Sequence, residues 1–314
     1  MIDIIIPAYN AHDTIVKTLS SIKLQTISDL VTVYIVDDCS KKGYKKEIDI
    51  FKNDLKIIEL KTPYNMGPGR ARQFALDNTN GTYVMFIDAD DQLYNAYVLN
   101  LLYYEIDTNE LDAVNSSEIL SNGEILKLNN SLHGKLYRRS FLIENNIRFS
   151  NTRYSEDNSF TKIVFNVSNR TKFIDIISYV YFINENSITN KNYSKNRENI
   201  VKYIMLNMVY TILELKKRNV SDCDSKIADF LLPGYIYVFS KVYFEGEENF
   251  KNLYKYCFRY EELFREYEHM YSLYDFIRHI SNMFYCSDRV SEKILVEFNS
   301  FRNKFLVGDK KTTN

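Results

Sequence analysis

The stretch Tyr83-Val84-Met85-Phe86-Ile87-Asp88-Ala89-Asp90-Asp91 joins an unbroken apolar run to three carboxylates. An apolar run without a polar residue is typical of a central strand that is covered on both faces. Carboxylates crowded at the end of such a strand repel one another unless a cation lies between them, and oxygen ligands suit Mg²⁺ or Mn²⁺. The alternative is that these acids cap a helix starting near Tyr94. The residues before the stretch favour the first interpretation.

Strand and helix patterns alternate along that preceding part of the chain. Strands are predicted at residues 2–7, 31–36 and 55–60, and helices at residues 15–22, 48–51 and 70–78. This alternation predicts an α/β fold with a mainly parallel sheet and helices on both faces. Ligands of such sheets bind beyond the carboxyl ends of the strands. Residues 7–10, 37–38 and 88–91 all follow strands, so we expect them to converge on one acidic cleft.

Composition narrows the class of protein. The chain has 314 residues, 45% of them apolar, which allows one large domain or two modest ones. A formal net charge of -1 indicates no broad basic surface, so nucleic acid is not an expected partner. The four cysteines lack paired spacing, which indicates a reducing compartment and neither a disulfide framework nor a zinc site. With no signal-peptide pattern and no membrane-spanning apolar run, we expect a cytoplasmic protein.

Two common nucleotide-binding signatures are missing from the sequence. The first predicted strand ends in Pro-Ala-Tyr-Asn rather than in the Gly-rich turn of a dinucleotide site, and no Walker-type Gly-Lys-Ser/Thr occurs. Residues 65–69 resemble a Gly-rich loop only superficially, and a plain turn explains them equally well.

The second half of the chain changes character. Residues 111–128 predict a hairpin around the turn at 121–123, and residues 134–139 predict a strand that leads into a helix at 140–146. Residues 155–157, Ser-Glu-Asp, precede a helix, where an N-cap with acidic first-turn residues is the alternative to a functional role. A last strand is predicted at 173–182. From residue 194 onward the pattern is helical, and the helix at 199–215 ends in basic residues.

Taken together, the motifs resemble those of glycosyltransferase family 2, the inverting nucleotide-sugar transferases with a GT-A fold. The resembling segments, in the family's order, are residues 4–10, 36–40, 65–73, 86–91, 135–141, 155–157 and 181–189. Each motif alone is modest, whereas the ordered set is highly specific. The chain departs from the family pattern at Cys39, where Gly is usual, and at Gln73, where Asn is usual.

The resemblance implies a site for a nucleotide sugar and a metal. It assigns uracil recognition to Asp38, and places Arg72 and Asp88 near the phosphates and the ribose. The other residues assigned to the nucleotide sugar are Pro7, Ala8, Tyr9, Asn10, Asn65, Gly67 and Ala89. It assigns the metal, Mn²⁺ or Mg²⁺, to Asp90 with Asp88 beside it, where the ion would bridge a diphosphate leaving group.

The resemblance also implies the catalytic groups. Asp157 takes the proton of the acceptor hydroxyl as that oxygen attacks the anomeric carbon, and Glu156 helps to position Asp157. A single displacement of this kind inverts the anomeric centre. Lys135 and Tyr137 are expected on the acceptor side.

The expected function is transfer of a hexose or an N-acetylhexosamine from a UDP-sugar to a hydroxyl acceptor, such as a cell-surface glycan or a teichoic-acid-like polymer. The alternatives are a catalytically inactive sugar-nucleotide-binding protein, which the intact carboxylates disfavour, and a nucleotidyltransferase, which the missing Gly-rich loop disfavours. We expect a transferase domain over residues 1–193 and a helical region over 194–314 that binds the acceptor, a partner or the inner face of the membrane. Donor sugar, acceptor and oligomeric state are left open.

Overall fold

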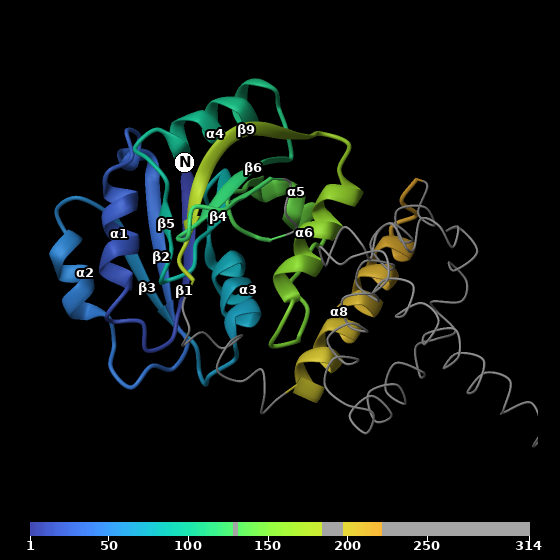
Figure 1. Ribbon diagram of the computed structural model, residues 1–314, viewed down its shortest axis with the longest axis horizontal. Coiled ribbons are helices and arrows are strands. Elements are labelled where there is room, and N and C mark those ends of the chain that lie inside the picture. The colour runs from blue at the N-terminus through green and yellow to red at the C-terminus, as the bar shows by residue number, and fades with distance from the viewer. Residues whose placement is uncertain (128–130, 184–196, 222–314) are drawn as a thin grey trace, which may run out of the picture. The chain divides into compact units, whose positions relative to one another are not determined.

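The computed structural model describes residues 1–127, 131–183 and 197–221 (Figure 1). The chain divides into two compact units, Met1–Val220 and Ser221–Asn314, and the sheet and the candidate site lie in the first. Most of the expected motif at 181–189 and the expected helical pattern beyond residue 221 lie outside the described residues. The functional division at residue 193 stays a prediction.

A single mixed sheet forms the centre of the first unit. Its strands lie in the order β3-β2-β1-β4-β8-β6-β9-β5, with β7 paired to β6. The first four are mutually parallel: β3 (Lys56–Lys61), β2 (Val31–Asp37), β1 (Ile2–Ala8) and β4 (Tyr83–Phe86). The others are β8 (Leu136–Arg138), β6 (Ala113–Leu120), β7 (Ile125–Leu126), β9 (Thr171–Tyr181) and β5 (Gln92–Leu93). The antiparallel neighbours of β8 are β4 and β6, and β9 runs parallel to β6.

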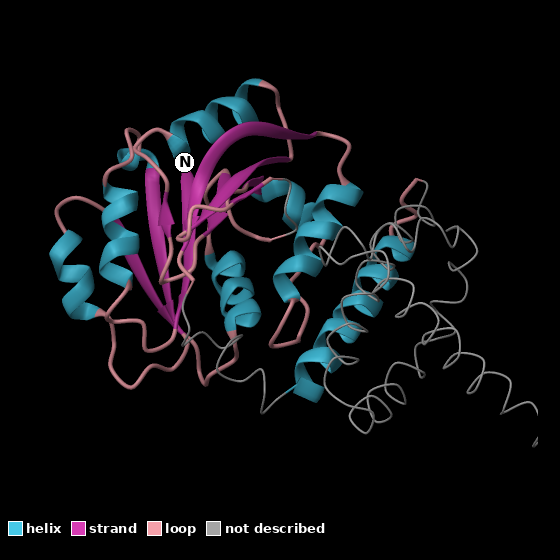
Figure 2. Cartoon of the chain, in the orientation of Figure 1, coloured by secondary structure: helices cyan, strands magenta, loops and turns pink. Residues whose placement is uncertain are grey.

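Helices cover both faces of this sheet, as the alternating pattern predicted (Figure 2). Packed into one core are α1 (Ile15–Lys23), α2 (Lys45–Phe51) and α4 (Val98–Thr108). Packed into the other are α3 (Pro68–Asn78), α5 (Arg139–Glu144) and α6 (Glu156–Val167). Strand β1 is buried on both faces because Ile4 belongs to the first core and Ile5 to the second. Helix α8 (Arg197–Lys217) packs against α6, and a short 3₁₀ turn spans Ser28–Leu30.

The acidic stretch after β4 does not cap a helix. The helix expected near Tyr94 begins at Val98, because residues 92–93 first form β5, which pairs with β9. Asp88 to Asp91 are thus separated from α4 by a strand and a turn, which removes the capping alternative.

The strand order of the sheet reverses at β1, which makes β1 the topological switch point. From β1 the chain moves to β2 on one side, whereas β4 lies on the other side of β1. In open α/β sheets the crevice at such a switch point is where ligands bind. Among the described residues, no helix is long and apolar enough to cross a bilayer.

Candidate functional site

The carboxyl ends of β1, β2 and β4 meet at the switch point. Ala8 pairs with Asp37 across β1 and β2, and the backbone N–H of Ile87 donates to the carbonyl of Ile5 at 3.1 Å. The predicted convergence of three strand ends is therefore present. It brings the loop after β1, the Asp37-Asp38 pair and Asp88 to one edge of the sheet.

Asp38 organises the loop that follows β3. Its carboxylate accepts hydrogen bonds from the Thr62 hydroxyl and from the backbone N–H groups of Met66 and Gly67, each at 2.8 Å. The Asn65 side-chain amide donates to the Asp38 carbonyl at 3.2 Å. Both oxygens of this buried carboxylate are thus bonded within the chain, a structural role that the motif did not reveal. Recognition of uracil by Asp38 stays a prediction.

The loop after β1 is tied to the loop after β2. The Asn10 backbone N–H donates to the Ser40 hydroxyl at 2.9 Å, and Asn10 Oδ1 accepts from the Lys41 N–H at 3.0 Å. Asn10 and Cys39 both have positive φ, 51° and 63°. A left-handed φ at Cys39 explains why glycine suits this position in the resembling motif. Tyr9 is half exposed beside these loops, at 51%.

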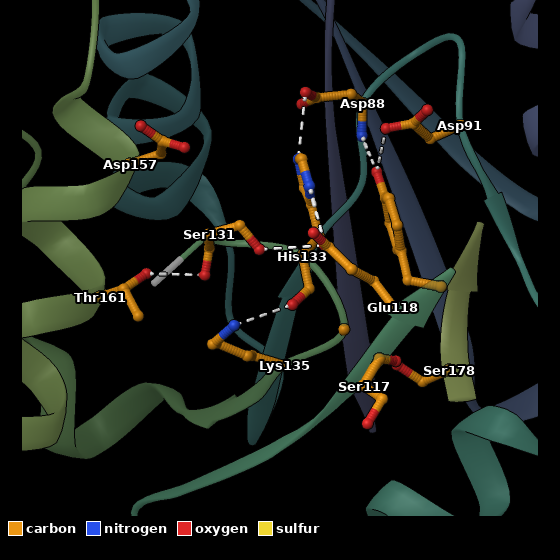
Figure 3. A network of polar contacts seen from close by, with 12 residues as sticks. Asp88, Asp91, Ser117, Glu118, Ser131, His133, Lys135, Asp157, Thr161 and Ser178 are labelled. Carbon is orange, nitrogen blue, oxygen red and sulfur yellow. Dashed lines mark hydrogen bonds and ion pairs between the residues drawn. The ribbon is translucent and has the colours of Figure 1, made fainter. Parts of the chain in front are cut away.

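Asp88, Asp91 and His133 gather beside the end of β4 (Figure 3). His133 Nε2 lies 3.3 Å from Asp88 Oδ2, and its Nδ1 lies 3.5 Å from Glu118 Oε2. Tyr179 stacks on the His133 ring at 4.6 Å and donates its hydroxyl proton to Asp91 Oδ2 at 2.8 Å. The imidazole is therefore held between two carboxylates and against an aromatic ring.

The pKa values of His133, Asp88 and Asp91 are shifted in different directions. Burial alone would lower the pKa of His133, but its hydrogen bonds to Asp88 and Glu118 outweigh burial and raise this pKa to about 10. Burial opposes ionisation of Asp88 too, yet Arg72 and His133 hold the pKa of Asp88 well below its usual range. Burial raises the pKa of Asp91 to about 7, helped by the Asp88 and Asp90 carboxylates. Asp91 therefore keeps its proton up to near-neutral pH, whereas the neighbouring Asp88 is ionised.

These residues fit a divalent cation. Asp88, Asp91 and His133 each offer one ligand atom, and these three atoms lie within 4.8 Å of one another. The carboxylates suit Mn²⁺ or Mg²⁺, while His133 offers a nitrogen only after losing its proton. Asp90, the expected main ligand, does not belong to this group of three, and its role stays a prediction.

Arg72 links this cluster to the start of α6. The buried guanidinium donates to Asp88 Oδ1 at 2.6 Å and to Glu156 Oε1 at 3.1 Å. Burial and the adjacent Asp157 carboxylate raise the pKa of Glu156 to about 7, against the opposing effect of Arg72. Gly69, one turn earlier on α3, leaves the space that Glu156 fills, because a Cβ there would lie 2.3 Å from Glu156 Cγ.

Asp157 lies in the first turn of α6, across the site from Asp88 in Figure 3. Burial lowers the pKa values of Lys135 and Lys162 to about 8, and in both cases the Asp157 carboxylate acts in the opposite direction. Ser155, directly before α6, has a φ of 63° and makes no side-chain capping hydrogen bond in the described structure. Ser155 does occupy the N-cap position, and Glu156 and Asp157 lie in the first turn, as that alternative predicted, but the capping hydrogen bond is not formed.

Lys135 and Tyr137 are both fully buried. The Lys135 ammonium donates to the His133 carbonyl at 3.1 Å, and Tyr137 packs against Phe86 and Phe160. Their assignment to the acceptor side stays a prediction. In this structure both side chains pack inside the protein beside the site.

Sequence reasoning missed several members of the site. Asp91 was visible in the acidic stretch but was not assigned a role. His133, Glu118 and Tyr179 had no motif to mark them, and His133 lies 45 residues from Asp88 in the chain. The only local hint in the sequence was that His133 comes just before Gly134 and Lys135, where a motif begins.

Known proteins match this chain in sequence. A family model described as Glycosyl transferase family 2 matches residues 3–172. EpsJ of Bacillus subtilis, described as an uncharacterized glycosyltransferase, is 26% identical over 218 residues, 60% of this chain and 63% of EpsJ. TarS of Staphylococcus aureus, a poly(ribitol-phosphate) beta-N-acetylglucosaminyltransferase, is 28% identical over 200 residues, 57% of this chain and 35% of TarS. The matched part is less than two-thirds of either relative.

Solved structures share the fold. The crystal structure of S. aureus TarS 1–349 with UDP-GlcNAc superposes with a TM-score of 0.64 at 23% identity, over 76% of this chain and 79% of that one. The mannosyltransferase PcManGT from Pyrobaculum calidifontis, with GDP-Man and Mn²⁺, gives 0.54 at 14% identity, over 91% and 88%. These likenesses confirm the predicted GT-A fold.

Proposed function

The chain belongs to glycosyl transferase family 2, and on that premise we propose that it is an inverting, metal-dependent enzyme that moves a sugar from a UDP-sugar to a hydroxyl acceptor. The observation that carries this proposal is the bridge made by Arg72. One guanidinium contacts Asp88, at the nucleotide-sugar edge of the sheet, and Glu156, next to the proposed base. Donor-side and acceptor-side groups are thus held in one rigid frame.

The nucleotide sugar would bind along the ends of β1, β2 and β4. In our proposal Tyr9 and its neighbours Pro7, Ala8 and Asn10 border the base. Asp38 fixes the loop of Asn65 and Gly67 beside it. Asp88 and Ala89 approach the ribose and Arg72 the phosphates. The Arg72 Nε is buried without a hydrogen-bond partner among the described residues, and a phosphate oxygen would satisfy it.

UDP is the proposed nucleotide because TarS, the relative described above, was crystallised with UDP-GlcNAc. Other relatives are named as transferases of glucose from UDP-Glc to a diphosphoundecaprenol-linked sugar. We therefore propose a hexosyl or N-acetylhexosaminyl group as the one transferred. A cell-surface glycan or a teichoic-acid-like polymer is the proposed acceptor.

Asp88 and Asp90 would hold the divalent cation, with Asp91 and His133 close by. When bound, such an ion neutralises charge on the diphosphate as it leaves. Arg72 shares that task from the protein, since it remains protonated next to two carboxylates. Tyr179 fixes Asp91 through its hydroxyl group and so keeps the cluster in place.

In the proposed chemical step Asp157 is the general base. The acceptor oxygen forms a bond to the anomeric carbon while the bond from that carbon to the diphosphate oxygen breaks. Asp157 takes the proton from the acceptor hydroxyl, and UDP leaves with the bonding electron pair. Attack opposite to the leaving group inverts the configuration. Glu156, anchored by Arg72, holds the first turn of α6 so that Asp157 faces the cleft.

The C-terminal residues 194–314 would bind the acceptor, a partner or the membrane surface, and we propose a cytoplasmic location at or near the inner face of the membrane. These assignments rest on the helical sequence pattern and on the polymer acceptor in the name of TarS.

One assay separates this function from its alternatives. UDP-GlcNAc and UDP-Glc are each incubated with the protein and poly(ribitol phosphate), with Mn²⁺ or with a chelator, and both UDP and glycosylated polymer are measured. Metal-dependent formation of both supports the proposal. Calorimetric binding without turnover favours an inactive sugar-nucleotide-binding protein. Release of diphosphate from a nucleoside triphosphate instead would favour a nucleotidyltransferase.

A further inference from the structure

The segment between α5 and α6 makes two different sets of contacts in alternation. On one side, Asn151 Oδ1 accepts from Arg70 Nε at 3.3 Å, and Arg153 Nη2 donates to the Asn65 carbonyl at 3.0 Å. These contacts reach α3 and the loop held by Asp38. Ser150, Thr152 and Tyr154 alternate with these two residues in the chain and contact α8 instead. A segment whose contacts alternate like this is fixed from both sides.

All three contacts on the second side converge on one side chain, that of Asn207 in α8. Asn207 Oδ1 accepts from the Ser150 hydroxyl, and Asn207 Nδ2 donates to Thr152 Oγ1 at 2.7 Å and to the Tyr154 carbonyl at 2.6 Å. The Asn207 carbonyl also accepts from the Ser159 hydroxyl of α6 at 3.1 Å. One residue therefore contacts the chain on both sides of Glu156 and Asp157.

Asn207 is 2% exposed, so these bonds are shielded from bulk water and contribute to holding the segment in place. The Tyr154 carbonyl comes directly before Ser155, whose φ of 63° is unfavourable for a residue with a side chain. Such a conformation persists only where the surroundings enforce it. Asn207 holds the carbonyl on the preceding side, and the orientation of the first turn of α6 depends on that backbone bend.

We propose that Asn207 is a positioning residue for Asp157, although it lies outside the part of the chain that matches the family model, residues 3–172. The inference rests on the proposed role of Asp157 as the base. It means that α8 belongs to the transferase site and sets the direction of Asp157 through the bend at Ser155. Loss of the Asn207 amide lets the bend relax, so Asp157 no longer meets the acceptor hydroxyl at the right distance.

The first test is a double-mutant cycle in the full-length protein. UDP-GlcNAc is the donor and poly(ribitol phosphate) the acceptor, and Kd for UDP-GlcNAc is measured by calorimetry on the same preparations. Asn207→Ala should lower kcat at least about tenfold and leave Kd for UDP-GlcNAc unchanged, because misplacement of a catalytic group by about 1 Å costs rate rather than donor binding. In the Asp157→Asn background, Asn207→Ala should have no further effect, because the group that it positions no longer acts as a base.

A second measurement needs no turnover. Amide hydrogen exchange of residues 150–158 should become faster in Asn207→Ala, while residues 31–37 of strand β2 keep their protection. If Asn207→Ala does not fold, Thr152→Val removes one partner of the Asn207 amide at nearly constant shape and should show a smaller effect in the same direction. The matched control is Tyr210→Phe, which removes a hydrogen bond from α8 to the Arg148 carbonyl and should leave kcat and the exchange of residues 150–158 unchanged.

The outcomes separate the two proposals. If Asp157→Asn transfers sugar normally, the proposed base is wrong. If Asp157→Asn is impaired but Asn207→Ala lowers kcat equally in both backgrounds, Asn207 acts on the fold in general and the positioning role is overturned. Unchanged hydrogen exchange at residues 150–158 overturns it as well, whatever the turnover.

Discussion

Gly69 and Glu156 lie so close together that a Cβ atom on Gly69 would be 2.3 Å from Glu156 Cγ. The two residues come from α3 and α6, so this contact fixes how closely the two helices approach beside the site. The same Glu156 is bound by Arg72 at 3.1 Å. Displacement of Glu156 would therefore disturb both Arg72 and the adjacent Asp157.

Gly69→Ala should reduce sugar transfer by at least about tenfold, because a shift of about 1 Å at a catalytic group has effects of that size or larger. Helix propensity alone would predict a slight gain in stability from this substitution, so lost activity would have to come from the contact with Glu156. Gly43→Ala is the control, since a Cβ there meets only Glu59 Oε1 at 3.5 Å. Equal activity of Gly69→Ala and wild type in a UDP-release assay would argue against tight packing at Glu156.

Arg72→Lys should weaken UDP-sugar binding and transfer together. A lysine ammonium is a point charge and does not reproduce a guanidinium that donates to Asp88 and Glu156 from two different nitrogens. Leaving one buried acid unpaired also costs stability, on the order of 3–5 kcal/mol for a broken buried pair. Chemical denaturation and calorimetry with UDP would measure both effects.

The control for Arg72 is Arg148→Lys. Arg148 forms a similar two-point ion pair with Asp77, but its side chain is 46% exposed. Exposed pairs contribute about 0–1 kcal/mol, so this variant should resemble wild type. An Arg72→Lys variant as stable and active as Arg148→Lys would show that the bridge contributes little.

Metal binding should depend on pH through Asp91. Its pKa is raised to about 7, so in the folded protein Asp91 keeps its proton up to that pH, whereas in the unfolded chain it loses the proton near pH 4. Between these values the folded state binds more protons, and the contribution of Asp91 to stability falls as pH rises to about 7. A metal bound to the carboxylate removes this penalty, and below pH 7 it competes with the proton.

The increase in melting temperature caused by Mn²⁺ should therefore be larger at pH 8 than at pH 5.5. If one proton is displaced from Asp91, affinity falls about tenfold for each pH unit below 7. Asp91→Asn should remove this dependence. A shift in melting temperature that is the same at both pH values in the wild type would mean that Asp91 is not near the ion.

Cys39→Gly should stabilise the protein slightly, by up to about 1 kcal/mol, without changing activity. The φ of 63° at Cys39 costs an L-residue about 1–2 kcal/mol in a left-handed conformation, and the greater freedom of glycine in the unfolded chain offsets part of the gain. Cys39→Ala keeps the unfavourable φ and should not stabilise. If both variants have the same melting temperature in a thermal scan, backbone conformation at this position is not the reason that glycine suits it.

Local sequence patterns predicted much of the fold. The strands at β1, β2 and β4 were visible as apolar runs, and the acids that follow them lie together because parallel strands end at one edge. Helix α4 was expected too early because nothing local distinguishes the two-residue strand β5, which forms only by pairing with β9. Sequence patterns predict elements well where burial shows in the residue types, and poorly where distant pairing defines them.

The site was less predictable than the fold. Asp88 and Asp157 stood out through motifs, but their neighbours come from remote parts of the chain. Tyr179 lies 91 residues from Asp88, and Asn207 lies 53 residues from Tyr154. Such contacts depend on where β9 pairs in the sheet and where α8 packs against α6. Periodicity and motif spacing in the sequence carry no information about this long-range pairing and packing.

The most direct test of the proposed chemistry is the transfer rate of Asp157→Asn measured beside its donor affinity. The substitution is nearly isosteric and removes the proton acceptor, so UDP-GlcNAc and Mn²⁺ binding should stay close to wild type in calorimetry, while product formation should fall about 10²–10⁴-fold. Asp175→Asn, at an exposed side chain paired with Lys127, is the matched control and should be fully active. Near-normal product formation by Asp157→Asn would contradict the account and turn attention to Glu156 as the base.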